Sequence, residues 1–415
     1  MSDYVPEWVK ADLMRFPRAE TEPGRRIRSI SALSSRAREA DARAYAAFMR
    51  RVRALDGRLN TVIAVQVENE TGLLGASRDR CPSAEEAFRS AVPSELLQHV
   101  QANRDSLWPE LKASWEAAGA RADGTWSEVF GSVADETFMA WVTACYVQAV
   151  TRAGKAEYPL PMFANAWLVQ RNDEHPGSYP SGGPVSRMFD IWRAAAPSLD
   201  CLAPDIYRPD FAQVCADYCW GGNPLLIPEA SRGIEAAGNA FYSIGRHDAL
   251  CFSPFGIDNV SDGRLLAKSY ELLAQLMPLI TGFQGIGRMT GFVQINPAAP
   301  EGEVQDMDLG GYRLHVTFPA GTQGRPPGGG LAIALTDDEY IVAGHGFMME
   351  FRPREGAFPN VEFMSLDEGT FRNGRWIPGR RLNGDERTIR IGTDERAARI
   401  GGEAAILRAK LHSFA

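Results

Sequence analysis

The sequence predicts an α/β protein with a parallel sheet, followed by an antiparallel β-domain. Two observations predict it. From about residue 60 to residue 280, short apolar runs rich in β-branched residues alternate with stretches of helical spacing, as in βα units. Past about residue 290 the helical spacing disappears, and short alternating runs separated by Gly, Pro, Asn and Asp remain.

Composition narrows the class of protein. The chain has 415 residues, of which 45% are hydrophobic and 23% charged, which is enough for a sizeable core. Its net charge of −8 argues against nucleic acid as a partner, because nucleic-acid binders carry a basic face. The 6 cysteines lack CxxC spacing and predict no zinc site, and no metal or organic cofactor is indicated. No apolar run is long enough to span a bilayer.

The elements before the sheet follow from local patterns. Residues 1 to 35 combine prolines with scattered charges and predict a structured loop. Alanines at helical spacing predict a helix from Ser35 to Leu55, with Gly57 as its stop. The run Thr61–Gly72 (TVIAVQVENETG) then predicts a strand buried on both faces. Further helices are predicted at Ala84–Phe88, Ser94–Asn103, Leu107–Ala118 and Asp135–Ala153.

The remaining parallel strands are predicted at Leu160–Leu168, Leu199–Tyr207, Pro224–Glu229 and Leu250–Phe255, and helices at Pro209–Cys219, Ile234–Gly245 and Asp262–Ile280. Five parallel strands result, whereas a (β/α)₈ barrel has eight. The fold is therefore an open α/β sheet, or the chain begins part-way round a barrel. The β-domain is predicted from eight runs: Tyr312–Phe318, Gly330–Thr336, Glu339–Gly344, Phe347–Arg352, Val361–Asp367, Trp376–Leu382, Thr388–Thr393 and Ala404–Lys410.

Two strand ends carry a glutamate: Glu70, which follows Asn69, and Glu229 in the segment IPEAS. A carboxylate at the end of a buried strand costs desolvation free energy, which proteins tolerate where the residue acts. Two opposed carboxylates are the minimal apparatus of glycoside hydrolysis. Buried ion pairs and a different hydrolase remain alternatives at this point.

The segments VQVENE at Val65–Glu70 and IPEAS at Ile227–Ser231 resemble the two active-site strand ends of glycoside hydrolase family 35, the retaining β-galactosidases. Tyr4–Arg18 and Glu39–Arg50 resemble the loop and helix that precede the fourth barrel strand of that family. The resemblance covers about residues 1 to 285. It implies a partial (β/α)₈ TIM barrel of about five βα units over residues 1–288. The short β-like runs that follow predict a β-sandwich-like domain over residues 289–415.

Carried over to this chain, the resemblance implies an exo-acting enzyme that removes terminal β-D-galactosides by double displacement. Glu70 is then the acid/base, Glu229 the nucleophile, and Asn69 the partner of the sugar 2-hydroxyl. Glu68 is expected on the same side of the strand, as a buried orienting partner. Sugar rings also need apolar platforms and fixed hydrogen bonds. The strand ends offer substrate-binding candidates, with barrel filling or a helix-facing position as the alternative role for each: Asn165, Trp167, Asp205, Tyr207 and Phe255.

Two features depart from the family. Thr71 stands where many members have an aromatic residue, and the family's first three strand units have no counterpart. Unpaired edges of a five-strand arc predict self-association. Other sugars (a β-glucoside, β-xyloside or arabinoside), or an inactive carbohydrate-binding remnant, are the alternative functions. A cytoplasmic location follows if Met1 is the true start, and a periplasmic or secreted one if a signal peptide precedes it.

Overall fold

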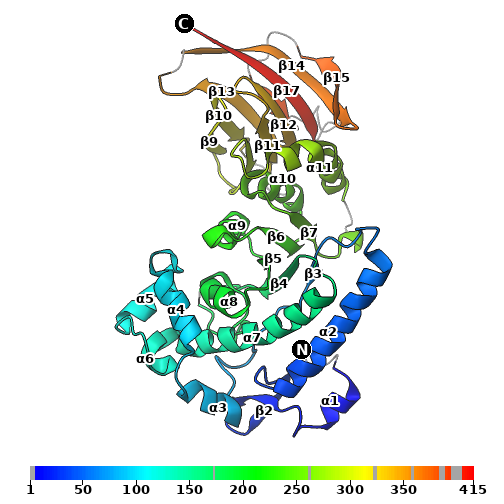
Figure 1. Cartoon of the computed structure of the whole chain (residues 1–415). Coiled ribbons are helices and arrows are strands. Elements are labelled where there is room, and N and C mark those ends of the chain that lie inside the picture. The colour runs from blue at the N-terminus through cyan, green and yellow to red at the C-terminus, as the bar shows by residue number, and fades with distance from the viewer. Residues whose placement is uncertain are drawn as a thin grey trace. The chain divides into compact units, whose positions relative to one another are not determined.

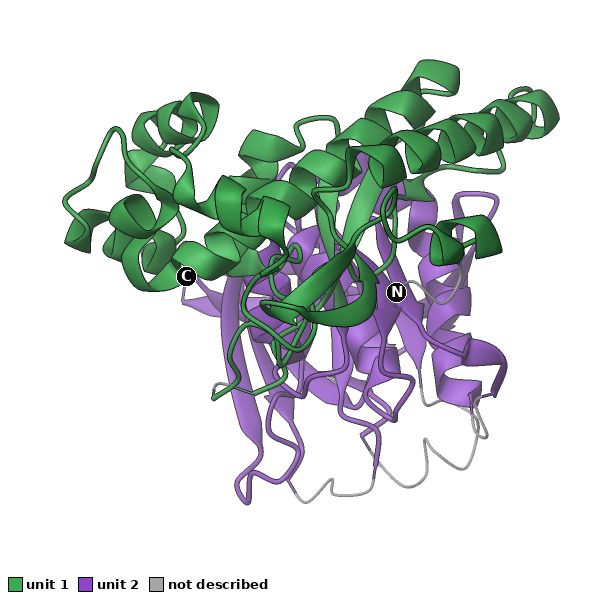
Figure 2. Ribbon diagram, turned by 90° about the horizontal axis from the view of Figure 1, so that it is seen from below, with its two compact units in different colours: residues 1–205, 220–223 green, residues 206–219, 224–415 purple. Residues whose placement is uncertain are grey.

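A computed structural model describes residues 5–171, 173–259, 263–320, 325–356, 359–382, 388–393 and 404–415. The chain forms two compact units, which Figure 2 distinguishes by colour. Unit 1 comprises residues 1–205 and 220–223, and unit 2 comprises residues 206–219 and 224–415. Within the described ranges, no helix combines the length and the apolar character that a membrane crossing requires.

A curled parallel sheet, shaped as a half-barrel, carries the strand ends of interest. Its strand order is β3-β4-β5-β6-β7, which is also their order in the chain. The strands are β3 (Val65–Gln66), β4 (Met162–Trp167), β5 (Cys201–Ile206), β6 (Leu226–Ala230) and β7 (Cys251–Pro254). The predicted α/β class is confirmed, and all five strands fall inside the predicted stretches or within one residue of them.

The first strand differs most from its prediction. Of the stretch Thr61–Gly72, only β3 pairs in the sheet, and the side chain of Ile63 is 78% exposed. The expectation of a strand buried on both faces is therefore wrong. The physical reason is position, because β3 lies at the end of the strand order, with β4 as its neighbour. Ahead of β3, the backbone N–H groups of Thr61 and Val62 donate to the carboxylate of Asp56 (2.9 and 3.0 Å) rather than to another strand.

Two long helices, α2 (Ser35–Asp56) and α7 (Ala134–Glu157), run alongside each other in unit 1 (Figure 1). The helix α2 begins where the Ser34 hydroxyl accepts the N–H of Ala37 at 3.2 Å, and it ends at Gly57 as predicted. An ion pair between Arg50 and Glu157 (2.6 Å) joins the two helices. After α2, the shorter α-helices described in this unit are α3 (Pro82–Arg89), α4 (Ser94–Ala102), α5 (Pro109–Ala117), α6 (Trp126–Phe130) and α8 (Phe189–Ala195).

The N-terminal segment is more regular than the predicted loop. It contains the short helix α1 (Glu7–Ala11) and a hairpin of β1 (Arg18–Glu22) and β2 (Arg25–Ile30). The turn between the strands is Pro23–Gly24, and Gly24 has φ +84°. Charged residues fill most of the hairpin, so the apolar alternation that indicates a strand is absent, although Pro-Gly is itself a turn signal.

Unit 2 contains β6 and β7, the helices α9 (Phe211–Tyr218), α10 (Ala236–His247) and α11 (Arg264–Phe283), and two antiparallel sheets. The sheet orders are β16-β13-β10-β9 and β15-β14-β17-β12-β11-β8. The strands are β8 (Met289–Val293), β9 (Glu303–Leu309), β10 (Tyr312–Phe318), β11 (Gly329–Ala334), β12 (Glu339–His345), β13 (Phe347–Pro353), β14 (Asn360–Arg372), β15 (Arg375–Arg381), β16 (Ile389–Ile391) and β17 (Ala405–Phe414). The eight predicted runs are all strands, and the sequence analysis missed β8 and β9.

One buried cluster joins the two antiparallel sheets. It includes Phe292 and Tyr340 from the larger sheet and Val316 and Phe347 from the smaller one, all fully buried. A shared core of this kind is typical of a sandwich. The predicted division of the chain at residues 288 and 289 falls between α11 and β8, and it stays a prediction.

Candidate active site

The segment that follows β3 is a tight turn. Glu68 and Glu70 both have positive φ angles, +62° and +44°, which residues with a side chain rarely adopt. The side-chain amide of Gln66 supports the turn, since its Nε2 donates to the carbonyl oxygen of Glu68 (2.9 Å) and to Oδ1 of Asn69 (3.0 Å). Glu68 and Glu70 lie in a turn, where side chains do not alternate between two faces as they do in a strand. The prediction that both side chains point to the same side of a strand therefore does not apply.

Asn165, on β4, holds the turn from the neighbouring strand. Its Oδ1 accepts the backbone N–H of Glu70 at 2.9 Å. Its Nδ2 donates to Oδ2 of Asp205 at 2.7 Å and to Oδ1 of Asn69 at 3.1 Å. The side chain is 1% exposed. Asn165, predicted as substrate-binding, is thus a buried link between Asn69, Glu70 and Asp205 in this structure.

Asn69 is exposed and oriented by its neighbours. Its Oδ1 accepts two hydrogen bonds, from Gln66 and from Asn165. Because the amide group is planar, these two donors direct its Nδ2 away from themselves. The exposed Asn69 side chain therefore presents a fixed donor, as the interaction with a sugar hydroxyl requires.

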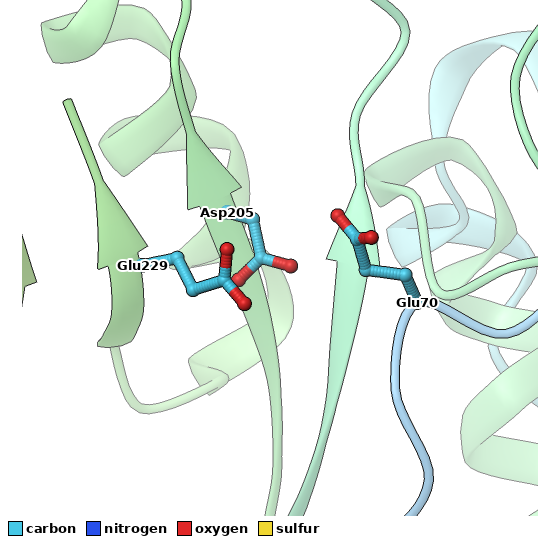
Figure 3. A group of neighbouring side chains, drawn as sticks. All are labelled: Glu70, Asp205 and Glu229. Atoms are coloured by element: carbon cyan, nitrogen blue, oxygen red, sulfur yellow. The ribbon is translucent and has the colours of Figure 1, made fainter. Parts of the chain in front are cut away.

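Asp205, at the end of β5, is one of the strand-end candidates and is a neighbour of Glu70. The carboxylates of Glu70 and Asp205 have oxygen atoms within 4.8 Å of each other, and Asp205 is 1% exposed. Figure 3 draws these two side chains together with Glu229. The position of Asp205 at the end of a predicted strand was the feature of the sequence that indicated it.

Carboxylates at this spacing raise the question of a cation. Calcium and magnesium take six or more oxygen ligands. Asn165, however, turns its NH₂ group toward Asp205, and an amide donor next to a carboxylate opposes a cation there. The absence of a metal cofactor stays a prediction.

Unit 2 provides the residues around Glu229, which lies on β6. The hydroxyl of Tyr207 donates to Oε2 of Glu229 at 2.7 Å. Tyr207 is 46% exposed, and Phe255, after β7, is 60% exposed. An exposed aromatic ring in contact with a carboxylate, as Tyr207 is, suits the apolar face of a sugar better than it suits a filled interior. Glu229 and Tyr207, two separate candidates from the sequence, are in direct contact.

A cavity of about 340 Å³ lies beside the turn in unit 1. Glu68, Asn69 and Glu70 line it on one side, and Trp167 at the end of β4 contributes to its wall. Trp167 is 38% exposed, so this predicted platform residue is accessible. The cavity also includes Leu73, Leu74, Asp41, Met139, Tyr146 and Val147.

Two residues around Glu68 escaped the sequence analysis. Asp41 on α2 hydrogen-bonds Glu68, and burial together with the Asp41 charge raises the pKa of Glu68 to about 8. The hydroxyl of Tyr146 on α7 donates to Oδ2 of Asp41 at 3.0 Å. Both residues sit within helices, where a polar side chain gives no sign of its distant partner.

The comparisons with known proteins concern the C-terminal part of the chain. Residues 266–392 match a family described as a domain of unknown function (DUF5597). The match begins within α11 and ends after β16, and it covers less than half of the chain. No curated protein matches the sequence.

Proposed function

We propose that the protein is a retaining, exo-acting glycoside hydrolase of the β-galactosidase type. The observation that carries the proposal is the fixed position of Glu70, whose backbone is held by Asn165 at the end of a parallel strand beside an open cavity. A second carboxylate, Glu229, stands on a strand of the same sheet. Carboxyl ends of parallel strands are where α/β barrels keep their chemistry.

In this proposal the parallel sheet is part of a (β/α)₈ barrel. The curled shape and the order β3-β4-β5-β6-β7, without a reversal, support it, because a doubly wound sheet reverses its strand order. In a barrel, strands in this order direct their carboxyl ends to one mouth. Retention requires the two carboxyl groups at a separation of about 5 to 5.5 Å.

The roles follow from the contacts of each carboxylate. Glu229 attacks the anomeric carbon as an anion, and the hydrogen bond from Tyr207 holds its Oε2 while the other oxygen attacks. Glu70 protonates the leaving oxygen and then activates the water that releases the glycosyl-enzyme. Asn69 donates to the sugar 2-hydroxyl, and Trp167 and Phe255 provide apolar surface. No metal or organic cofactor takes part.

The test is hydrolysis of aryl β-galactosides by the chain and by single variants at each glutamate. Glu229→Gln should lose activity with every leaving group. Glu70→Gln should retain most of its kcat/KM on a substrate with a very good leaving group, which departs without a proton, and lose it on a poor one; its kcat should fall on both, because release of the glycosyl-enzyme still needs the base. Glu303→Gln, in the β-domain, is a matched control. Equal hydrolysis by the wild type and Glu229→Gln would refute the nucleophile assignment.

A panel of aryl glycosides decides between this substrate and a β-glucoside, β-xyloside or arabinoside. Sugar binding without turnover, at high protein concentration, would favour an inactive carbohydrate-binding remnant. Self-association through the edge next to β3 is a further part of the proposal, supported by the exposure of Ile63 (78%) and Leu59 (71%). Sedimentation of the wild type against Ile63→Lys tests it.

A further inference from the structure

Glu68 connects the proposed catalytic turn, to which its backbone belongs, with the helices α2 and α7. Its backbone belongs to the turn, where its carbonyl oxygen accepts from Gln66 and its φ angle is +62°. Its side chain hydrogen-bonds Asp41 on α2. Asp41 in turn accepts from the Tyr146 hydroxyl on α7 at 3.0 Å. A chain of hydrogen bonds thus joins both helices to the turn.

The helices provide a firm support. They have 22 and 24 residues and are joined by the ion pair of Arg50 with Glu157. By contrast, β3 is two residues long, so the sheet alone gives the turn little support. The positive φ angles of Glu68 and Glu70 add strain of about 1 to 3 kcal/mol each, which the surroundings must offset.

The bond between Glu68 and Asp41 requires a proton, because two carboxylates are both acceptors. Burial and the Asp41 charge raise the pKa of Glu68, so Glu68 carries the proton and donates it to Asp41, which also accepts from Tyr146. Within the described residues, two more titratable groups face Glu68. They are Tyr45 on α2, whose pKa is raised to about 12 by burial and by the Glu68 charge, and Tyr146, whose pKa is also raised. Arg38 on α2 lies close enough to lower the pKa of Tyr146.

We propose that Glu68, as a carboxylic acid bonded to Asp41, is a positioning residue that fixes the turn carrying Asn69 and Glu70. The proposal rests on the proposed function, in which those two residues contact substrate. Ionisation of Glu68 places two negative charges side by side and breaks the bond that anchors the turn. Above pH 8 the enzyme therefore loses activity through the turn.

The first experiment compares pH profiles of kcat/KM for the wild type, Glu68→Gln, Glu68→Ala and Asp41→Asn. Glu68→Ala should fall by about tenfold or more at pH 7, since a displaced acid loses near-attack geometry. Glu68→Gln keeps a donor toward Asp41, cannot ionise, and should recover most of that loss and extend activity above pH 8. Glu39→Ala, on the exposed face of α2, is the matched control. An unchanged alkaline fall in Glu68→Gln would overturn the proposal.

The second experiment does not need activity. Amide hydrogen exchange of residues 66–72 at pH 7 should be faster in Glu68→Ala than in the wild type, and close to wild type in Glu68→Gln and Glu39→Ala. Equal exchange in Glu68→Ala and the wild type would refute the positioning role. If no glycoside is hydrolysed by any form while the exchange result holds, the proposed function fails and the anchoring of the turn by Glu68 stands.

Discussion

The backbone N–H of Glu70 donates to Oδ1 of Asn165 across two neighbouring strands, at 2.9 Å. The side-chain amide of Asn165 also donates, through its Nδ2, to Asp205 and to Asn69. One buried side chain therefore sets both the backbone of the proposed acid/base and the orientation of the proposed sugar-binding amide. A substitution at Asn165 should affect stability and catalysis together.

Replacing Asn165 with alanine should lower the free energy of unfolding by about 1 to 3 kcal/mol, because the buried carboxylate of Asp205 and the Glu70 N–H lose this partner. Urea denaturation measures the change. Asn69→Ala is the matched control, since Asn69 is exposed; it should reduce hydrolysis with little loss of stability. Equal stabilities of Asn165→Ala and Asn69→Ala would contradict the role of Asn165.

Replacing Tyr207 with phenylalanine removes the hydroxyl that binds Oε2 of Glu229 at 2.7 Å. Hydrogen bonds to charged groups contribute about 1.5 to 3 kcal/mol, and the partial exposure of Tyr207 places this one at the lower end. We expect kcat/KM for an aryl galactoside to fall about tenfold. Tyr242→Phe, in α10 of the same unit, is the control and should leave the rate unchanged; a rate for Tyr207→Phe equal to that of the control would rule out the contact.

The sequence predicted the regular parts of the fold well. Helix α2 has the predicted start at Ser35 and ends within one residue, because a serine cap, an alanine-rich face and a following Gly are all local signals. Strand β10 matches its predicted range, since its burial alternates along the chain. The hairpin of β1 and β2 consists largely of charged residues and lacks the apolar alternation that indicates a strand. The prediction of a loop there was therefore wrong.

Only part of the candidate site could be predicted from local sequence patterns. The polar cluster at Asn69 and Glu70 was visible in the sequence because it interrupts an apolar run. Its supporting partners were not, because Asp41 and Tyr146 lie in helices remote in the chain and only the fold brings them to Glu68. The turn itself was also unexpected, since positive φ at two glutamates is contrary to backbone preference.

Gly72 should resist substitution for a geometric reason. It has φ +139°, and a Cβ there would lie 2.7 Å from the backbone of Pro180. The next residue, Leu73, exchanges backbone hydrogen bonds with Ser181 at 2.9 and 2.8 Å. Gly72→Ala should therefore destabilise the protein by more than about 1 kcal/mol and disturb the turn. Gly24→Ala is the control, because Gly24 has φ +84° but open space around the position that a Cβ would take, so this variant shows the effect of φ alone. Thermal melts measure both variants. A loss of stability in Gly24→Ala equal to that in Gly72→Ala would contradict the clash with Pro180.

His345 should make unit 2 sensitive to acid. The side chain is 3% exposed in β12, next to Phe241, and burial lowers its pKa to about 4. The unfolded chain, with a His pKa near 6.5, binds more protons than the folded one below that pH. Stability therefore falls as pH drops from about 6.5 toward 4, by about 2 kcal/mol between pH 7 and pH 5. His345→Gln should show a smaller fall in urea denaturation at the two pH values, whereas His315→Gln, at the protein surface beside Asp306, should keep the wild-type fall. Identical pH dependence in His345→Gln and the wild type would show that His345 does not control acid stability.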